Sequence, residues 1–277
     1  MPELPEVEIV VRSLNKLLRS RRIERAELRR KLLAPSIKPQ IFAKRLAKAQ
    51  IKFIHRRGKH ILFDLDNGRT LIAHLRMSGR FMLLDHDADD PKFAHAVFHL
   101  DGGERLVFQD QRHFGFMNVA ETPRLFEMKE LSKLAPEPFS DEFDDGYLRK
   151  LLKSTSRNIK QLLLDQTKVC GVGNIYASEA MFIAGIRPTA RSNSITLKKT
   201  ILLRKAVVQV MNATLEIGAK ISLDRWNIGG NIYGPGADGD WLVYGREGKP
   251  CPKCSAPIAR IVQSTRSTFF CRKCQSR

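Results

Sequence analysis

Residues 171–182 read GVGNIYASEAMF, and the glycines of this stretch decide between two fold classes. A dinucleotide-binding fingerprint, G-x-G-x-x-G, needs a third glycine at position 176, where the chain has Tyr176. The fingerprint also follows a strand, whereas the segment before Gly171 has the apolar spacing of a helix. We therefore predict a helix, a glycine-rich turn and a second helix. Asn174 is placed to cap that second helix, whose first backbone amides suit an anion such as DNA phosphate.

The segments around this turn are also helical in pattern. Helices are predicted at 146–154, 158–165, 174–185 and 196–217, all after the APEPF segment at 135–139. Residues 219–245 contain too many glycines for one regular element. Their aromatic residues, Trp226, Tyr233 and Trp241, make this segment a candidate functional loop.

The N-terminal half has a different pattern. Apolar residues between positions 5 and 19 recur at helical spacing, and the first turn of this helix carries acidic residues that complement its dipole. From Ile51 onward, apolar and polar residues alternate, and Asn67-Gly68 and Asp101-Gly102 provide turns. This half is therefore predicted to be an antiparallel sheet or sandwich with a flanking helix.

Four of the five cysteines form two C-x-x-C pairs. Cys251 and Cys254 are followed after sixteen residues by Cys271 and Cys274, a spacing typical of tetrahedral zinc coordination in a two-hairpin ribbon. Disulfides do not suit a cytoplasmic protein, and a redox motif does not need two matching pairs. Because protein ligands fill all four positions, we predict one structural zinc ion. The fifth cysteine is predicted to be a buried small side chain.

The composition points to a polyanionic partner. The chain of 277 residues has a formal net charge of +19 and a pI near 10.0, and residues 1–60 hold 17 Lys/Arg against 5 Asp/Glu. Such a field favours nucleic acid, although a merely solvated basic surface is the alternative. There is no apolar run of membrane-spanning length and no signal peptide pattern. The expectation is therefore a cytoplasmic, nucleoid-associated monomer with no membrane partner.

Several short segments together resemble one family. PELPEVE at 2–8, RRGKHILFDL at 56–65, HLRMSGR at 74–80, DQRHFGF at 110–116, GVGNIYASE and VYGREGKPC at 243–251 are similar to segments of bacterial formamidopyrimidine-DNA glycosylase, in the family's order. The resemblance implies an α+β, two-lobed protein. Its expected parts are a catalytic β-sandwich at 1–135, a helix-two-turn-helix domain at 136–218, a lesion-capping loop at 219–245 and a zinc ribbon at 246–277.

The resemblance also implies catalytic residues. Once Met1 is removed, Pro2 presents a secondary amine with a pKa of about 8, so a useful fraction is nucleophilic at neutral pH. By resemblance, Glu3 protonates the sugar ring oxygen, Glu6 organises the site, Lys59 transfers protons during β-elimination, and Arg266 binds the phosphates beside the lesion. The alternatives are an ordinary helix start for the acidic residues and a surface lysine at a hairpin for Lys59.

Further side chains are assigned to DNA binding. By resemblance, a void-filling trio enters the duplex where the damaged nucleotide leaves it: Met77, Arg112 and Phe114. Met77 and Phe114 are alternatively core residues, and Arg112 is alternatively part of a surface ion pair. Phosphate-binding candidates and the retained family histidine complete the set: Lys160, Asn174, Arg157 and His95.

The chain departs from the family pattern at three places. Phe93 replaces a DNA-contacting histidine, His113 replaces an arginine, and Gly218-Ala219 replaces the glycine pair that begins the capping loop. Alanine reaches positive φ less readily than glycine, so base preference is the least determined property. The leading hypothesis is a bifunctional glycosylase and abasic-site lyase for oxidised purines. The alternatives are an endonuclease VIII-like enzyme for oxidised pyrimidines and a non-catalytic zinc-ribbon DNA-binding protein.

Overall fold

The computed structural model describes residues 2–219, 224–228 and 241–276, which form two compact units. The first unit comprises residues 1–132 and 215–237, and the second comprises residues 133–214 and 238–277. Most of the predicted capping loop, including Tyr233, lies outside the described residues. Within the described ranges, no helix has the length and apolar character needed to cross a bilayer.

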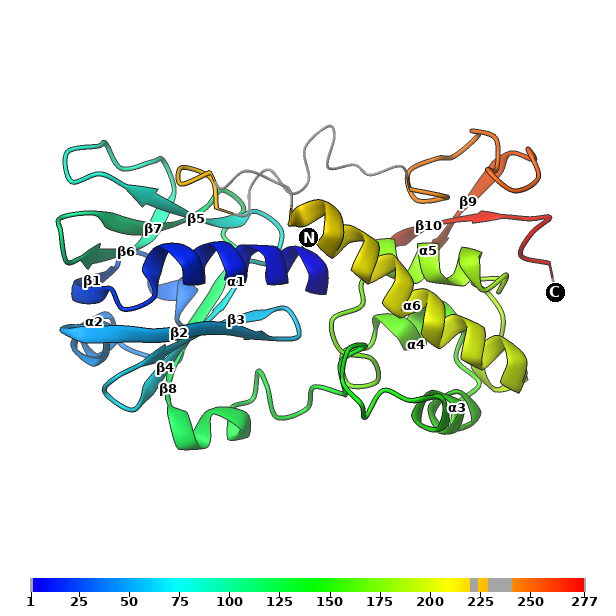
Figure 1. Ribbon diagram of the computed structural model, residues 1–277, viewed down its shortest axis with the longest axis horizontal. Coiled ribbons are helices and arrows are strands. Elements are labelled where there is room, and N and C mark those ends of the chain that lie inside the picture. Colours follow the sequence, from blue (N-terminus) through cyan, green and yellow to red (C-terminus); the bar gives the residue numbers. More distant parts are fainter. Residues whose placement is uncertain (1, 220–223, 229–240, 277) are drawn as a thin grey trace. The chain divides into compact units, whose positions relative to one another are not determined.

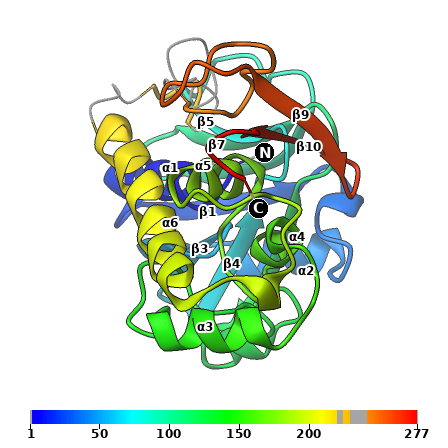
Figure 2. The ribbon, with the colours of Figure 1, turned by 90° about the vertical axis from the view of Figure 1, so that its right-hand side faces the viewer.

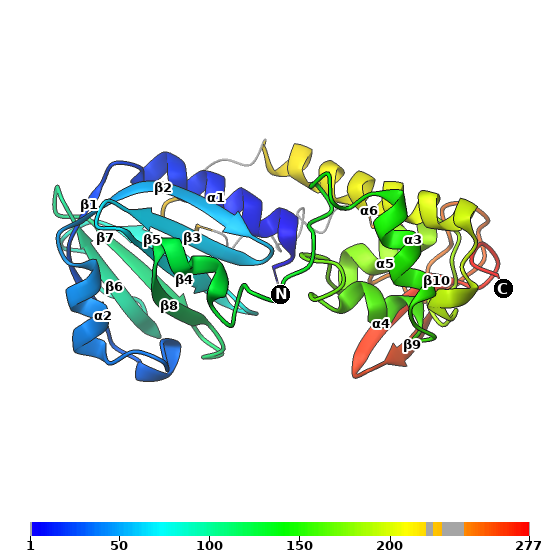
Figure 3. The ribbon, with the colours of Figure 1, turned by 90° about the horizontal axis from the view of Figure 1, so that it is seen from below.

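The first unit is built on antiparallel strands. Its helices are α1 (Leu4–Leu18) and α2 (Pro39–Leu46), and two short 3-10 helices lie at Lys31–Leu33 and Thr122–Glu127. Its strands are β1 (Arg22–Leu28), β2 (Ala49–Arg57), β3 (His60–Leu65), β4 (Arg69–His74), β5 (Gly79–Leu84), β6 (Ala94–Leu100), β7 (Arg105–Asp110) and β8 (Phe116–Glu121). Helix α1 packs on β2 and β3 (Figure 1), and α2 packs on β1 (Figure 3).

The sheet folds over on itself into a sandwich. The strand order is β5-β7-β6-β1-β2-β3-β4-β8, and β1 and β2 are joined by only two residue pairs. Although four strands separate β3 from β5 in this order, the rings of Phe63 and Phe81 lie 5.6 Å apart. Phe81 in turn contacts Phe108 of β7 at 5.2 Å. Inward-facing apolar residues from both halves therefore share one core, as the alternating pattern predicts.

The second unit is mainly helical. It contains α3 (Asp145–Lys153), α4 (Ile159–Leu164), α5 (Asn174–Ile183), a 3-10 helix at Ser192–Ser194, most of α6 (Leu197–Gly218), β9 (Ile258–Gln263) and β10 (Arg266–Cys271). Asp144 and Asn158 cap α3 and α4 through their side chains. Helix α5 packs against β10 (Figure 2).

The glycine-rich turn connects α4 to α5, which confirms the predicted helix, turn and helix. Gln166 holds the turn by accepting from the Gly171 N–H at 2.9 Å and donating to the Val172 carbonyl at 2.8 Å. The predicted cap is wrong, however, because Gly173 is the N-cap and Asn174 is the first helical residue. Its amide donates instead to the Ser267 carbonyl at 3.0 Å, a partner 93 residues away.

Glu179 of α5 anchors the segment that leads into the ribbon. Its buried carboxylate accepts from the backbone N–H groups of Leu242, Val243 and Tyr244 at 2.8, 2.9 and 2.8 Å. Burial raises the pKa of Glu179 even though these three hydrogen bonds favour its charged form.

We expect Glu179→Ala to lower the free energy of unfolding by about 3 kcal/mol, because it leaves the N–H groups of Leu242, Val243 and Tyr244 without their acceptor. Chemical denaturation of the two proteins measures this difference. The matched control is Glu142→Ala, an exposed glutamate of the same unit, which should stay within about 0.5 kcal/mol of the wild type. Equal effects of the two substitutions would contradict the anchoring role.

Candidate active site and zinc centre

Two buried carboxylates, those of Glu3 and Glu6, lie at the N-terminus of α1. Glu3 is the N-cap, its side chain accepts from the Glu6 N–H, and the Glu6 carboxylate accepts from the Glu3 N–H at 2.8 Å. Both side chains are 3% exposed, and Pro2 is buried beside them in the sequence. This reciprocal capping box stabilises the helix start. The E-x-x-E spacing of Glu3 and Glu6 is the sequence signal for this capping box, which was not predicted.

Lys59 occupies a two-residue turn between β2 and β3. Gly58 takes the positive φ of 59° that such hairpins require, and Arg57 and His60 pair across the turn. The side chain of Lys59 is only 5% exposed, so the alternative of a surface lysine is wrong. A buried lysine needs polar surroundings, which is consistent with a positioned functional group.

Two histidines lie next to this lysine. The rings of His60 and His74 meet edge to face with centroids 4.8 Å apart. Burial lowers the pKa of His60 to about 4, and it lowers the pKa of His74 well below its usual value, with further lowering from His60, Arg76 and Lys59. Both rings are therefore neutral at pH 7, and His74 Nδ1 accepts from the Arg76 N–H at 2.9 Å.

The burial of His60 predicts acid sensitivity. Its pKa falls from 6.5 to about 4 on folding, so its stabilising contribution is complete above pH 6.5 and is lost as the pH falls toward 4. We expect His60→Gln to reduce the loss of unfolding free energy between pH 7.5 and pH 5 by about 2 kcal/mol relative to wild type. Urea unfolding at both pH values measures it, and an unchanged pH dependence would contradict the prediction.

The predicted void-filling trio lies on two loops of the first unit: Met77 lies between β4 and β5, and Arg112 and Phe114 lie between β7 and β8. Met77 and Phe114 are 47% and 53% exposed, so neither is a core residue. The Arg112 guanidinium carbon lies 5.0 Å from the centre of the Phe114 ring. Among the residues described here, Arg112 makes no ion pair. The structure thus presents an arginine, an aromatic ring and a thioether as exposed side chains.

His95 is buried and contacts the loop between β7 and β8. Its Nε2 lies 2.7 Å from Nδ1 of His113 and 3.0 Å from the carbonyl oxygen of Asp110. Burial is the main cause that lowers the pKa of His95. Phe93 and His113 both have positive φ, at 67° and 61°, and their rings meet at 5.4 Å. The two departures from the family pattern are therefore neighbours around the retained histidine.

In the second unit, two phosphate-binding candidates support the β9–β10 hairpin. Lys160 Nζ donates to the Ser267 carbonyl at 2.9 Å and to Thr268 Oγ1 at 2.5 Å, and Asn174 donates to the same carbonyl. Ser267 is 107 residues from Lys160, so no local sequence pattern predicts this convergence. Arg266, next to Ser267, is exposed at the start of β10. Their role in DNA binding stays a prediction.

The remaining phosphate-binding candidate already has a protein partner. Arg157 Nη1 pairs with Asp165 Oδ2 at 3.0 Å, and both groups are partly exposed. Such a pair contributes little to stability. An approaching phosphate therefore has to compete with the Asp165 carboxylate for this guanidinium.

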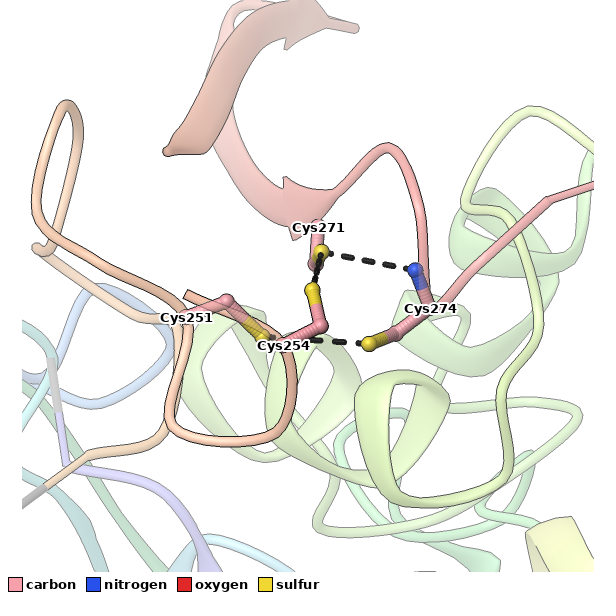
Figure 4. A group of neighbouring side chains, drawn as sticks. All are labelled: Cys251, Cys254, Cys271 and Cys274. Carbon is pink, nitrogen blue, oxygen red and sulfur yellow. Dashed lines mark hydrogen bonds between the residues drawn. The ribbon is translucent and has the colours of Figure 1, made fainter. Parts of the chain in front are cut away.

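The four predicted cysteine ligands converge (Figure 4), and their Sγ atoms all lie within 4.8 Å of one another. Cys251 Sγ is 3.8 Å from Cys274 Sγ, and Cys254 Sγ is 3.5 Å from Cys271 Sγ. These distances are too long for disulfides and close to the separation of about 3.8 Å expected between thiolates on one tetrahedral zinc ion. The N–H groups of Lys253 and Cys274 point at two of the sulfurs at 3.4 Å. The donor set fits one structural zinc.

The fold and the cysteine cluster together define a zinc-ribbon protein in which one chain carries a β-sandwich unit and a helix-two-turn-helix unit. Three family models match it: the formamidopyrimidine-DNA glycosylase N-terminal domain over residues 1–117, the H2TH domain over 134–225, and the zinc finger found in FPG and IleRS over 248–277. Formamidopyrimidine-DNA glycosylase of Bacillus licheniformis is 41% identical over 282 residues, covering 100% of both chains. The chain therefore belongs to the formamidopyrimidine-DNA glycosylase family.

Solved structures agree with this assignment. The wild-type Lactococcus lactis enzyme in complex with DNA containing N7-benzyl-Fapy-dG has a TM-score of 0.91 and 32% identity, with 100% of both chains covered. The same enzyme with DNA containing an abasic site has a TM-score of 0.90 and 31% identity, covering 99% of this chain. The predicted α+β fold with its sandwich, helix-two-turn-helix unit and zinc ribbon is confirmed.

Proposed function

We propose that this protein is a bifunctional DNA glycosylase and abasic-site lyase of base excision repair that acts on oxidised purines in duplex DNA. The observation that carries the proposal is the buried carboxylate pair of Glu3 and Glu6 directly after Pro2. An ordinary capping box needs no proline at position 2, whereas an N-terminal proline beside a carboxylic acid supplies a nucleophilic secondary amine and a proton donor for amine catalysis.

The proposed first step forms a covalent bond between the Pro2 nitrogen and C1′ of the damaged nucleotide. The base leaves with the electron pair of its glycosidic bond and takes up the proton that the Pro2 nitrogen releases. Glu3 gives a proton to the ring oxygen O4′, and the C1′–O4′ bond opens as the nitrogen lone pair forms the C1′=N double bond of an iminium. The resulting iminium has no N–H proton to lose, so it persists as an electron sink. The Glu6 carboxylate accepts a hydrogen bond from the Glu3 backbone N–H at 2.8 Å and thereby stabilises the helix start.

The iminium then drives strand scission. Loss of a C2′ proton expels the 3′ phosphate, and loss of a C4′ proton expels the 5′ phosphate, after which water releases the sugar remnant from Pro2. We assign Lys59 to proton transfer in the first elimination and Arg266 to binding the phosphates that flank the lesion. The burial of Lys59 and the exposure of Arg266 support these assignments.

The remaining residues are proposed to hold the DNA. Met77, Arg112 and Phe114 occupy the space left by the extruded nucleotide, which is consistent with their exposure in the first unit. The other assignments to DNA binding are Lys160, Asn174, Arg157 and His95. We also propose that the domains divide the chain into residues 1–135, 136–218, 219–245 and 246–277. The protein is proposed to be a monomer that acts at the bacterial nucleoid.

An oxidised-pyrimidine substrate is the second candidate. The Lactococcus lactis relative was also solved with DNA containing an oxidised pyrimidine, at a TM-score of 0.90 and 31% identity. The residues that would close over the base fall largely outside the described part of this chain, so base preference rests on the family resemblance.

Borohydride trapping tests the chemistry and the substrate together. The protein is incubated with a duplex carrying one 8-oxoguanine opposite cytosine, borohydride is added, and mass spectrometry identifies the modified peptide. An adduct on Pro2 supports both parts of the proposal. Trapping only on an oxidised-pyrimidine duplex would replace the substrate, and tight binding without trapping on any lesion or abasic duplex would favour a non-catalytic DNA-binding protein.

A further inference from the structure

Asp110, the last residue of β7, is a fully buried carboxylate between two loops. Its Oδ1 accepts from Ser78 Oγ at 2.5 Å and from the Arg112 N–H at 3.2 Å. Its Oδ2 accepts from the Gly115 N–H at 2.6 Å. The Arg112 N–H also donates to Ser78 Oγ at 3.0 Å, which closes a small network around one side chain.

The donors in this network directly adjoin the three exposed side chains assigned to void filling. Ser78 follows Met77, the Arg112 N–H belongs to the arginine itself, and Gly115 follows Phe114. Met77 and Ser78 lie between β4 and β5, whereas Arg112 and Gly115 lie between β7 and β8. One carboxylate therefore links two loops that are far apart in the sequence.

Two glycines next to Asp110 leave no room for a larger side chain at their positions. Gly79 pairs with Asp110 across β5 and β7, and a Cβ on Gly79 or on Gly115 would come within 2.7 Å of the Phe108 side chain. The Asp110 carbonyl oxygen accepts from the His113 N–H at 3.3 Å and lies 3.0 Å from His95 Nε2. Both loops are thus held against the end of β7 by groups on one residue.

The buried carboxylate of Asp110 is surrounded by hydrogen-bond donors that carry no charge. In the described ranges, no lysine or arginine pairs with it, and hydrogen bonds from Ser78, Arg112 and Gly115 surround it instead. A buried carboxylate is costly unless it is well solvated by such donors. An apolar residue would fill the space at lower cost, so a packing role alone does not account for it.

We propose that Asp110 is the positioning residue that holds Met77, Arg112 and Phe114 in one fixed arrangement, so that the three side chains enter the duplex together. This inference rests on the proposed function. The carboxylate does not touch the nucleotide in this role. It acts through the two loops, whose relative displacement by an ångström is enough to impair base extrusion.

The test separates extrusion from amine chemistry. Asp110→Asn replaces one acceptor oxygen by an NH2 group that faces an N–H or O–H donor. We expect single-turnover excision of 8-oxoguanine to fall about 100-fold, while trapping on a duplex with a preformed abasic site, which has no base to unstack, changes less than about threefold. Asp64→Asn is the matched control, because Asp64 bonds His55 and Thr70 in the same unit and reaches neither loop.

Equal losses in excision and trapping, or no loss of excision, would overturn the inference. If Asp110→Asn does not fold, Ser78→Ala decides, with an expected loss of about tenfold in excision and none in trapping. Unchanged excision by Ser78→Ala would then refute the linkage. If the wild type itself is neither trapped nor excises any lesion, the proposed function has failed, and that result is distinct from a selective effect at Asp110.

Discussion

Protein that retains Met1 is expected to lose borohydride trapping on abasic DNA by about 1,000-fold or more, because its nucleophile becomes a peptide nitrogen without a free electron pair. The proposed chemistry depends wholly on the Pro2 amine, since Glu3 and Lys59 only transfer protons. No neighbouring amine in the site is expected to substitute. The effect should therefore be much larger than that of removing any single proton-transfer group.

The experiment can use one preparation as its own control. Chain with Met1 retained is assayed before and after treatment with methionine aminopeptidase, and mass spectrometry reports which terminus is present. Trapping should appear only after Met1 is removed, while affinity for the abasic duplex stays within about threefold because the phosphate-binding residues are unchanged. Full trapping with Met1 in place would show that another residue is the nucleophile.

Loss of zinc is expected to unfold the ribbon and to weaken binding to lesion duplex by about 100-fold. The ribbon core is small: Cys251, Ile258, Phe269 and Cys271 pack with Val243 and with Phe182 of α5. A segment of this size cannot offset its conformational entropy with so little apolar burial, so metal binding supplies the folding free energy. Arg266 lies on β10 of this ribbon and loses its support when the hairpin unfolds.

Cys271→Ser tests this expectation, because Cys271 is fully buried and is one of the four ligands. Zinc content, circular dichroism and fluorescence anisotropy with labelled duplex at fixed salt should change together. Cys170→Ala is the control, since Cys170 is a buried cysteine that is not part of the cluster, and it should keep one zinc per chain. A zinc-free ribbon that stays folded and binds DNA normally would contradict the structural role of the metal.

Features set by local spacing were predictable. The helix near the N-terminus, predicted at 5–19, is α1 at Leu4–Leu18, and the stretch predicted at 196–217 is α6 at Leu197–Gly218. Both follow from apolar periodicity, which one segment of chain contains by itself. The zinc site was predictable for the same reason, because each C-x-x-C pair already places two sulfurs close together.

Features that depend on distant partners were not predictable. Asn174 has the sequence position of a helix cap, yet its amide bonds Ser267, and Lys160 converges on the same carbonyl. Asp110 has the sequence position of a residue at the end of a strand, and no neighbouring residue in the sequence predicts its hydrogen bond from Ser78. His95 and His113 meet because of the turn after β7, not because of their spacing.

Local patterns were enough to predict the periodic helices, the alternating strands, the cysteine ligands and the carboxylates that follow Pro2. The burial of Lys59, the exposure of Met77 and Phe114, and the link that Asp110 makes between their two loops depend on the folded sandwich. Periodicity and short motifs act within a few residues, whereas burial and hydrogen-bond partners depend on which strands come together in the tertiary structure.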